Sequence, residues 1–213
     1  MYIGVERGFL QIENDIIHYS ASGGTPNVQV DVAFTDITNI LPSRTQTDRI
    51  LNATDTDPNE VCSEKTIYLG VGFPATRVDT DFRKRHVKAD GISSSGIGKP
   101  GHCEPLGFTP FTHIAMEFSK RKMWVGDKIQ QAPKPHGMSG GGLFRFDSIK
   151  NLHDSDAADQ DKLIGVMIEY HQNRSVIVAT NIVFALEAIR HSFPQVSAHI
   201  PTPTTVRLNL QRA

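Results

Sequence analysis

The chain of 213 residues has a mass of 23.5 kDa, which suits one large domain or two small ones that share an interface. Its 22 lysine and arginine residues nearly balance its 23 aspartate and glutamate residues, so the formal charge of -1 provides no basic field to attract nucleic acid. We expect a cytoplasmic protein without a nucleic-acid or membrane partner, because no segment has the apolar length of a membrane span and the first residues lack a signal-peptide pattern.

The first part of the chain is predicted to form short strands. Residues 2–19 are rich in β-branched and aromatic side chains and are broken by the turn-like ERG and END, which indicates two or three strands. The next strand, VQVDVAFTDIT (28–38), carries Asp31 in the middle of an apolar run. A carboxylate in a buried strand must find a partner or lose its charge, so Asp31 is a candidate functional residue; on an edge strand it would be a solvated acid or a turn cap.

The middle and end of the chain read as strands with one late helix. Residues 46–60 are polar and turn-rich, which predicts a linker, and residues 83–102 are predicted to be an exposed loop. An amphipathic helix is expected at 185–193 and a tail at 199–213. The remaining predicted strands are TIYLGVGFP (66–74), FTHIAMEFS (111–119), KMWVGDKI (122–129), LFRF (143–146), KLIGVMIEY (162–170) and SVIVATNI (175–182).

The segment HGMSGGGLF (136–144) places one serine, Ser139, among four glycines. A serine hydroxyl becomes a nucleophile when a base takes its proton, and the oxyanion that forms needs backbone N–H donors directed at one point. Glycines at 137, 140 and 141 allow the backbone to bend in that way and let a substrate carbonyl approach closely. Ser139 is therefore the main candidate nucleophile.

Residues 137–141 also satisfy the G-x-S-x-G pattern of the α/β-hydrolase nucleophile elbow. That motif requires a strand directly before the serine, but the preceding IQQAPKPH is polar and interrupted by Pro133 and Pro135. It also requires repeated alternation of strands and helices, which the predicted elements lack. An α/β-hydrolase esterase is therefore kept as a minor alternative.

The same segment, GMSGG, resembles the G-x-S-G-G motif of trypsin-like serine proteases, which have the chymotrypsin fold. DVAF (31–34) is similar to that family's strand bearing the catalytic aspartate, GVGFP (70–74) to the strand end that opens the second barrel, and LIGVMIEY (163–170) to the strand beside the substrate cleft. The resemblance spans nearly the whole chain. It implies an all-β fold of two antiparallel β-barrels with a C-terminal helix, in which residues 1–45 form an incomplete first barrel and residues 61–198 the second.

The resemblance also implies roles for individual residues. Ser139 would be the nucleophile and Asp31 the acid of the triad, and the N–H groups of Gly137 and Ser139 would form the oxyanion hole. Ile168, Glu169 and Tyr170 would border the primary specificity pocket. The implied partner is a polypeptide substrate or peptide ligand, and no metal or organic cofactor is implied; Cys62 and Cys103, the only cysteines, lie outside any CxxC pairing.

The chain departs from the family pattern at the catalytic base. The family's histidine precedes its aspartate by a helical turn and at least two strands, whereas His18 is the sole histidine before Asp31 and lies too close to it. The resemblance then implies an N-terminally shortened protein with an impaired triad, and His136 is expected to have a cleft or surface role. Met138 replaces the aspartate with which digestive members bind a new N-terminus. Two hypotheses follow, a serine endopeptidase or an inactive protease-fold module that binds peptides.

Overall fold

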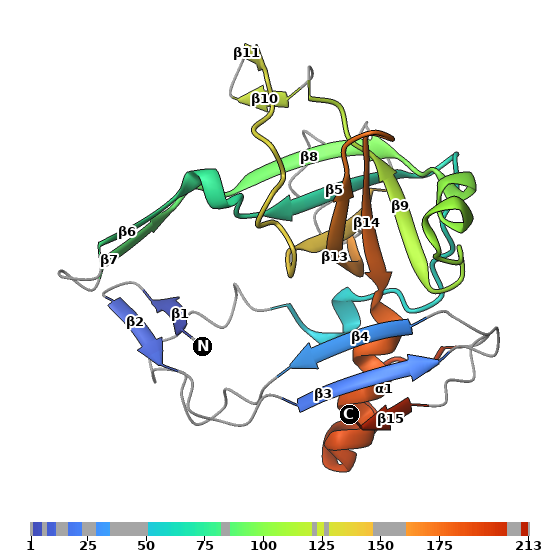
Figure 1. Cartoon of the computed structure of the whole chain (residues 1–213). Coiled ribbons are helices and arrows are strands. Elements are labelled where there is room, and N and C mark those ends of the chain that lie inside the picture. The colour runs from blue at the N-terminus through green and yellow to red at the C-terminus, as the bar shows by residue number, and fades with distance from the viewer. Residues whose placement is uncertain are drawn as a thin grey trace.

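Figure 1 shows the computed structural model of the chain, which describes residues 2–5, 8–11, 17–22, 29–34, 51–81, 86–120, 123–125, 128–146, 161–203 and 210–212. The strands in chain order are β1 (Tyr2–Val5), β2 (Gly8–Gln11), β3 (Ile17–Ser22), β4 (Gln29–Phe34), β5 (Ile67–Gly72), β6 (Val78–Asp81), β7 (His86–Ala89), β8 (Ile92–Ile97), β9 (His113–Glu117), β10 (Met123–Val125), β11 (Lys128–Gln130), β12 (Gly142–Phe146), β13 (Lys162–His171), β14 (Val176–Asn181) and β15 (Leu210–Arg212). The α-helix found among these residues is α1 (Ile182–Ser192).

Six strands form one antiparallel sheet in the order β8-β5-β12-β13-β14-β9. The sheet curls until its two edge strands approach each other, as Figure 1 shows. At the meeting point Gly98 forms a β-bridge with Met116, and the amide of Lys99 donates a hydrogen bond to the carbonyl of Ala115 at 2.8 Å. The curl encloses one face of the sheet, which becomes the core.

The core consists of apolar side chains from all parts of this sheet. Each of the six residues of β14 is buried, as is typical of a strand covered on both faces. Burial of a large apolar side chain stabilises the fold by roughly 1.5–3 kcal/mol, so this cluster is the main source of stability. Its largest fully buried members are Tyr68, Ile114, Met116, Phe118, Leu143, Ile164 and Met167.

The closure of the sheet depends on Gly96. A β-carbon at this position would lie 1.9 Å from the carbonyl oxygen of Glu117, so only glycine lets β8 approach the end of β9. The prediction of an exposed loop at residues 83–102 is wrong here, because β7 and β8 occupy much of this range. Ile92 and Ser94 are buried in alternation with exposed neighbours. The serines and glycines of this segment have low strand propensity, but packing against β9 stabilises it as a strand.

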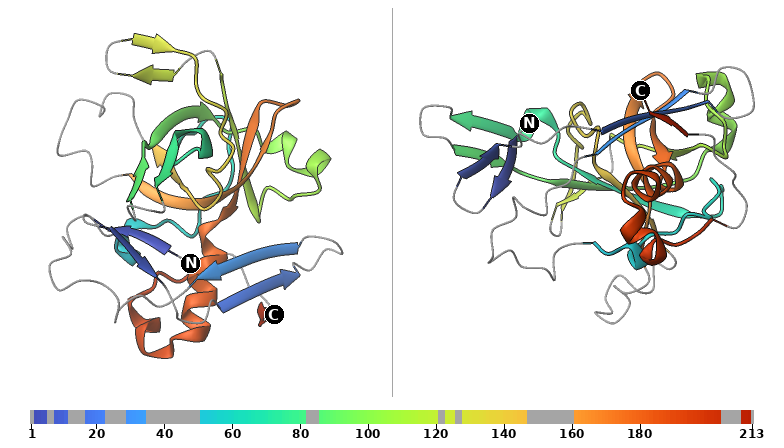
Figure 2. Two further views of the ribbon diagram at one scale, coloured as in Figure 1. Left: turned by 60° about the vertical axis from the view of Figure 1, so that its left-hand side comes forward. Right: turned by 90° about the horizontal axis from the view of Figure 1, so that it is seen from below.

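The described N-terminal strands form two small antiparallel sheets. One is the β1–β2 pair, and the other has the order β15-β3-β4. Helix α1 contacts β4 on one side and β13 and β14 on the other, so it joins this second sheet to the curled sheet (Figure 1). In the left view of Figure 2 the β10–β11 hairpin projects away from the curled sheet. Part of the expected C-terminal tail, Leu210–Arg212, is thus a strand paired with β3.

Helix α1 begins three residues before the predicted start at 185. Asn181 caps it, because its side-chain oxygen accepts a hydrogen bond from the amide of Val183 at 3.0 Å. Near the other end, the guanidinium of Arg190 donates hydrogen bonds to the carbonyls of Ile200 at 3.1 Å and Pro201 at 2.8 Å. The chain beyond the helix is therefore held against it at least as far as residue 201.

Residues 51–60, the described part of the predicted linker, are held against the curled sheet. Arg145 of β12 contacts the carboxylates of Asp57 at 2.6 Å and Glu60 at 3.1 Å. Glu60 also accepts a hydrogen bond from the hydroxyl of Tyr68 at 2.8 Å, and its backbone carbonyl accepts one from the side chain of Asn181 at 2.8 Å. Burial, together with the adjacent Glu60 carboxylate, raises the pKa of Tyr68.

His113 is a buried, neutral histidine at the start of β9. Only 1 % of its surface is exposed, and burial lowers its pKa to about 4. Its Nδ1 atom shares a hydrogen bond of 2.7 Å with the hydroxyl of Thr112, and its ring lies 4.3 Å from that of Phe108 between centroids. The imidazole is thus part of the protein interior.

Cys62 and Cys103, distant in sequence, are neighbours in the fold. Both are free and buried. The thiol of Cys62 lies 3.4 Å from the carbonyl oxygen of Ala115, and that of Cys103 lies 3.8 Å from the carbonyl oxygen of His113, so both approach the same edge strand. Interaction with Cys103 lowers the pKa of Cys62, while interaction with Cys62 and burial raise the pKa of Cys103.

The prediction of a mostly β protein with one late helix is confirmed at this level. The described residues do not show the alternation of strands and helices that the minor α/β-hydrolase alternative requires, since the curled sheet is antiparallel and α1 is the α-helix found among them. Within the same residues, no helix combines the length and apolarity needed to cross a bilayer.

Candidate active site

Ser139 lies at the tip of a tight loop between residue 135 and β12. The loop turns at Gly137 and Gly140, whose φ angles of 88° and 87° fall in the left-handed region that favours glycine. Between these turns the side chain of Met138 points inward and is only 2 % exposed, whereas Ser139 is exposed. One buried side chain therefore anchors the loop and leaves the adjacent hydroxyl in solvent.

Backbone hydrogen bonds connect this loop to its surroundings on two sides. On one side, the amide of Ala75, which follows β5, donates to the carbonyl of His136 at 2.7 Å. On the other, the amide of Gly140 donates to the carbonyl of Met167 at 2.8 Å, and the amide of Met167 donates to the carbonyl of Gly141 at 2.8 Å. The position of Ser139 relative to β13 is thus set by a reciprocal pair of bonds.

The amides of Gly137 and Ser139 differ from their neighbours in the loop. Those of Met138, Gly140 and Gly141 donate to backbone carbonyls, but the amides at 137 and 139 donate to no described group. Both residues are exposed. Two unoccupied donors beside a serine hydroxyl are what a developing oxyanion requires.

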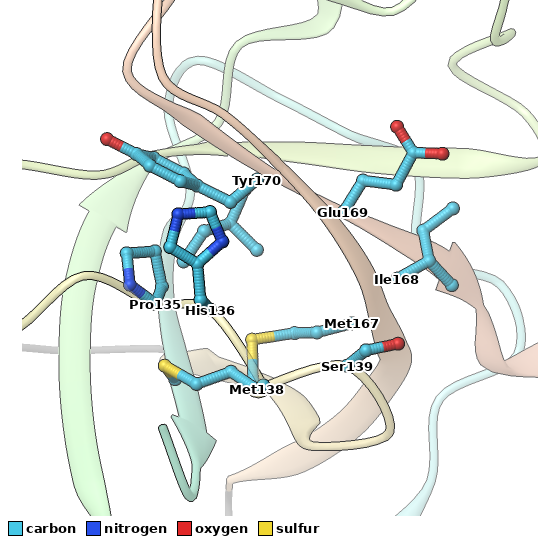
Figure 3. Close-up of a pocket in the computed structure, with 10 residues that line it drawn as sticks. Pro135, His136, Met138, Ser139, Met167, Ile168, Glu169 and Tyr170 are labelled. Carbon is cyan, nitrogen blue, oxygen red and sulfur yellow. The ribbon is translucent and has the colours of Figure 1, made fainter. Parts of the chain in front are cut away.

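The loop and β13 enclose a pocket of about 120 Å³ (Figure 3). Every residue predicted for the substrate side of the site is found there, namely Gly137, Ser139, Ile168, Glu169 and Tyr170. The predicted nucleophile and predicted pocket residues are therefore brought together. The other residues that line the pocket are Pro135, His136, Met138, Met167 and Ile177.

Three of these additional residues, Met138, Met167 and Ile177, lie in the core and were missed in the sequence analysis. Ile177 enters the site because it is paired with Tyr170 across β13 and β14, and antiparallel partners point to the same face. The sequence shows that both segments are strands but does not show their register. The signal that could have identified Met138 is its position beside Ser139 in a loop that needs an anchor.

Tyr170 forms a side wall of the pocket and is held by surrounding side chains. Its ring makes edge-to-face contacts with Phe118 at 5.3 Å and His136 at 6.4 Å between centroids. The ammonium of Lys120 lies 5.7 Å from the centre of the same ring. The Tyr170 hydroxyl is buried without a hydrogen-bond partner among the described groups.

Glu169 lies at the mouth of the pocket and not at its base. Its side chain is 51 % exposed, and its carboxylate lies 2.8 Å from Nε2 of His171. Those two atoms are within ion-pair distance, but Nε2 makes no hydrogen bond with a described group, which indicates poor alignment. In Figure 3 the carboxylate points away from His136 and Tyr170. Glu169 therefore contributes its backbone, more than its charge, to the pocket.

No described histidine side chain faces the hydroxyl of Ser139 within the pocket. His136 is the histidine among the lining residues, but Figure 3 shows its ring beside Tyr170, while the Ser139 hydroxyl points to the opposite side, near Ile168. Asp31 and His18 lie in β4 and β3, paired with Ser20 and Ala33, respectively. Their side chains lie outside the described part of the structure, so the predicted triad acid remains a prediction.

In the described part of the chain, no strand pairs with the edge of β13 beside the pocket. β12 pairs with β13 only from Lys162 to Val166, and from Met167 to His171 the described strands pair with β13 only through β14. The pairing with β14 shifts register between Met167 and Glu169, which marks a β-bulge at Ile168. An extended peptide could therefore pair with the free edge and pass directly beside Ser139.

No protein-family model matches the chain, and none of the curated proteins is detectably similar to it. The loop, the pocket and the free strand edge are therefore the features that indicate a function.

Proposed function

We propose that the chain is a serine endopeptidase of the trypsin-like type, with Ser139 as its nucleophile and the two-barrel architecture of that family. The observation that carries the proposal is the combination at one loop of an exposed serine and two amides, of Gly137 and Ser139, that have no described acceptor. The pocket and the free edge of β13 begin directly beside them.

The proposed reaction follows from this arrangement. A peptide pairs with the edge of β13 at Ile168–Tyr170, which places a scissile carbonyl beside Ser139. Oγ of Ser139 adds to the carbonyl carbon as its proton passes to a base, and the carbonyl oxygen accepts hydrogen bonds from the two amides. The intermediate expels the amine, which takes the proton, and leaves an acyl ester on Ser139. Water then adds in the same way and releases the acid.

By resemblance to the family, the base would be a histidine oriented by Asp31. His18 is the sole histidine before Asp31 and lies too close to it, so the proposed activity of this chain is impaired at the proton transfer. His136 does not fill that role in the observed conformation, because its ring and the Ser139 hydroxyl point to opposite sides of the pocket. The same observation favours a second candidate function, a protease-fold module that binds extended peptides at this cleft without cleaving them. In both functions the ligand is a polypeptide and the same pocket receives one of its side chains.

Reaction with a fluorophosphonate distinguishes the two functions. This reagent forms a phosphonate ester with an activated serine and releases fluoride. The peptidase predicts an adduct on Ser139, identified by peptide mass mapping, that is lost in Ser139→Ala. Ser95→Ala, a change at an exposed serine of β8, should leave the adduct unchanged. An unlabelled chain that still binds peptides would support the binding module, and labelling that persists in Ser139→Ala would contradict both assignments of Ser139.

A further inference from the structure

The floor and the mouth of the pocket differ in chemistry. The floor is formed by the side chains of Met138, Met167 and Ile177, which are 2 %, 1 % and 2 % exposed. Of the polar lining residues, Ser139, His136 and Glu169 are exposed. A ligand group that enters the pocket therefore leaves water for an apolar surface.

The floor offers no partner for a charged side chain. Glu169, the lining residue with a carboxylate, points away from the pocket interior and contacts His171 at 2.8 Å. A lysine, arginine or glutamate side chain that reaches the floor would lose its hydration without gaining an ion pair from Met138, Met167 or Ile177. An apolar side chain has no such cost and gains from burial.

The volume of the pocket sets the size of that side chain. A dry engineered cavity of about 150 Å³ accommodates benzene, which has six carbon atoms. By comparison the pocket of about 120 Å³ holds roughly four or five non-hydrogen atoms. Leucine and methionine side chains each have four non-hydrogen atoms, whereas a phenylalanine side chain has seven.

The backbone of β5 behind Met138 and Met167 limits the depth of the pocket. Met138 and Met167 already pack against the backbone of β5 at Gly72, where an added β-carbon would lie 3.3 Å from Met138 Cε and 3.2 Å from Met167 Cε. The two flexible side chains can adjust their shape to a ligand, but they have little room to withdraw.

We infer that this pocket selects peptides with a leucine or methionine side chain that enters it when the peptide carbonyl lies beside Ser139. The inference rests on the proposed function. Met138 and Met167 are the specificity-determining residues, and Glu169 does not select basic side chains.

The test measures binding and needs no catalysis. Peptides of the form acetyl-Ala-Ala-Ala-X, with X being Gly, Leu, Met, Phe, Lys or Glu, are titrated calorimetrically into the full chain. Each buried methylene is worth a factor of about four in affinity, so the Leu and Met peptides should bind at least roughly tenfold tighter than the Gly peptide. They should also bind more tightly than the Phe, Lys and Glu peptides. Equal affinities across the series, or tightest binding of the Lys or Glu peptide, would overturn the inference.

Changes to the floor provide the second measurement. Met138→Ala removes three side-chain atoms and should raise the affinity for the Phe peptide relative to the Leu peptide by roughly fivefold or more. Met116→Ala is the matched control, because Met116 is also fully buried but does not line the pocket, and it should leave the preference unchanged. Met138→Leu conserves volume and keeps the test possible if the alanine variant does not fold; it should retain the preference for Leu and Met over Gly.

The two proposals fail independently. A fluorophosphonate adduct on Ser139 together with no preference among the peptides would refute the specificity and leave the peptidase. A clear preference for the Leu and Met peptides without an adduct would refute the peptidase and leave the pocket's selectivity.

Discussion

The amide of Gly140 donates a hydrogen bond to the carbonyl of Met167 at 2.8 Å, immediately after the serine and at the first residue of β13 that β12 no longer pairs. This bond joins the loop that carries Ser139 to the strand that lines the pocket. It also means that the spacing between the hydroxyl and the free strand edge is set by the backbone. Side-chain substitutions on β13 that line the pocket should therefore alter ligand preference without moving Ser139.

Gly137 is the position at which the loop should tolerate substitution least. Its φ angle is 88°, and a β-carbon there would lie 2.6 Å from the amide nitrogen of Ala75. We expect Gly137→Ala to reduce the free energy of unfolding by about 2–4 kcal/mol and to abolish fluorophosphonate labelling of Ser139. Urea denaturation and mass mapping measure these two effects.

Two other glycines serve as controls for this prediction. Gly140 has a φ angle of 87° but open space around the β-carbon position, so Gly140→Ala should cost only about 1 kcal/mol from backbone strain. Gly101 has neither a positive φ nor a neighbour within 4 Å, and its replacement by alanine should have almost no effect. Equal stability losses in all three variants would show that the turn at Gly137 has no special role.

The parts of the site that could be predicted from sequence are those specified by local residues. The turns around Ser139 require glycine because their φ angles are positive, and the spacing of the glycines alone indicates the loop. The run LIGVMIEY (163–170) is apolar enough to identify β13. Both signals involve residues adjacent in the chain.

The parts that could not be predicted depend on residues far apart in sequence. Ile177 lines the pocket because of its register with Tyr170, and β8 is a strand because Gly96 allows close approach to Glu117. Neither relationship leaves a periodic pattern in the sequence. The same holds for the anchoring of residues 51–60, where Arg145 contacts Glu60 from 85 positions away. Local propensity indicates the turns of this segment, but its contacts with β12 and β5 come from tertiary packing.

Glu60 should contribute to stability and not to ligand binding. Its side chain is largely buried, with partners in Tyr68 and Arg145, and it lies outside the pocket lining. Glu60→Ala removes the acceptor of the buried Tyr68 hydroxyl and one of the carboxylates that contact Arg145. The free energy of unfolding should therefore fall by about 2–4 kcal/mol. Glu64→Ala, at an exposed position nearby, should change stability by less than about 0.5 kcal/mol. A loss of peptide affinity in folded Glu60→Ala would contradict this separation.

His113 should make stability depend on pH below neutrality. Its pKa in the folded state is about 4, below the ordinary value of 6.5, because the buried ring is costly to charge. Above pH 6.5 the imidazole is neutral in both states and its contribution is fully present. As pH falls toward 4 the unfolded chain binds a proton that the folded chain does not, so about 3 kcal/mol of stability is lost over that window.

The measurement for His113 is the free energy of unfolding at pH 7 and at pH 4.5, for the native chain and for His113→Gln. The glutamine variant should be less stable at pH 7 but should lose less stability on acidification, because its side chain does not titrate in this range. His199→Gln changes an exposed histidine and should retain the native pH profile. Identical acid-induced losses in the native chain and His113→Gln would show that other groups cause the dependence.

The two cysteines should be protected from alkylation in the folded protein. Cys62 and Cys103 are both buried, and the reactive thiolate of Cys103 is further disfavoured because its pKa is raised. We expect iodoacetamide to modify neither thiol appreciably under native conditions and to modify both in guanidinium chloride. Cys62, which retains slight exposure and has the lowered pKa, should react first as denaturant is added. Mass spectrometry of each alkylated peptide measures the order, and prompt modification of Cys103 in native buffer would show that the segment joining β8 to β9 opens far more readily than its buried contacts imply.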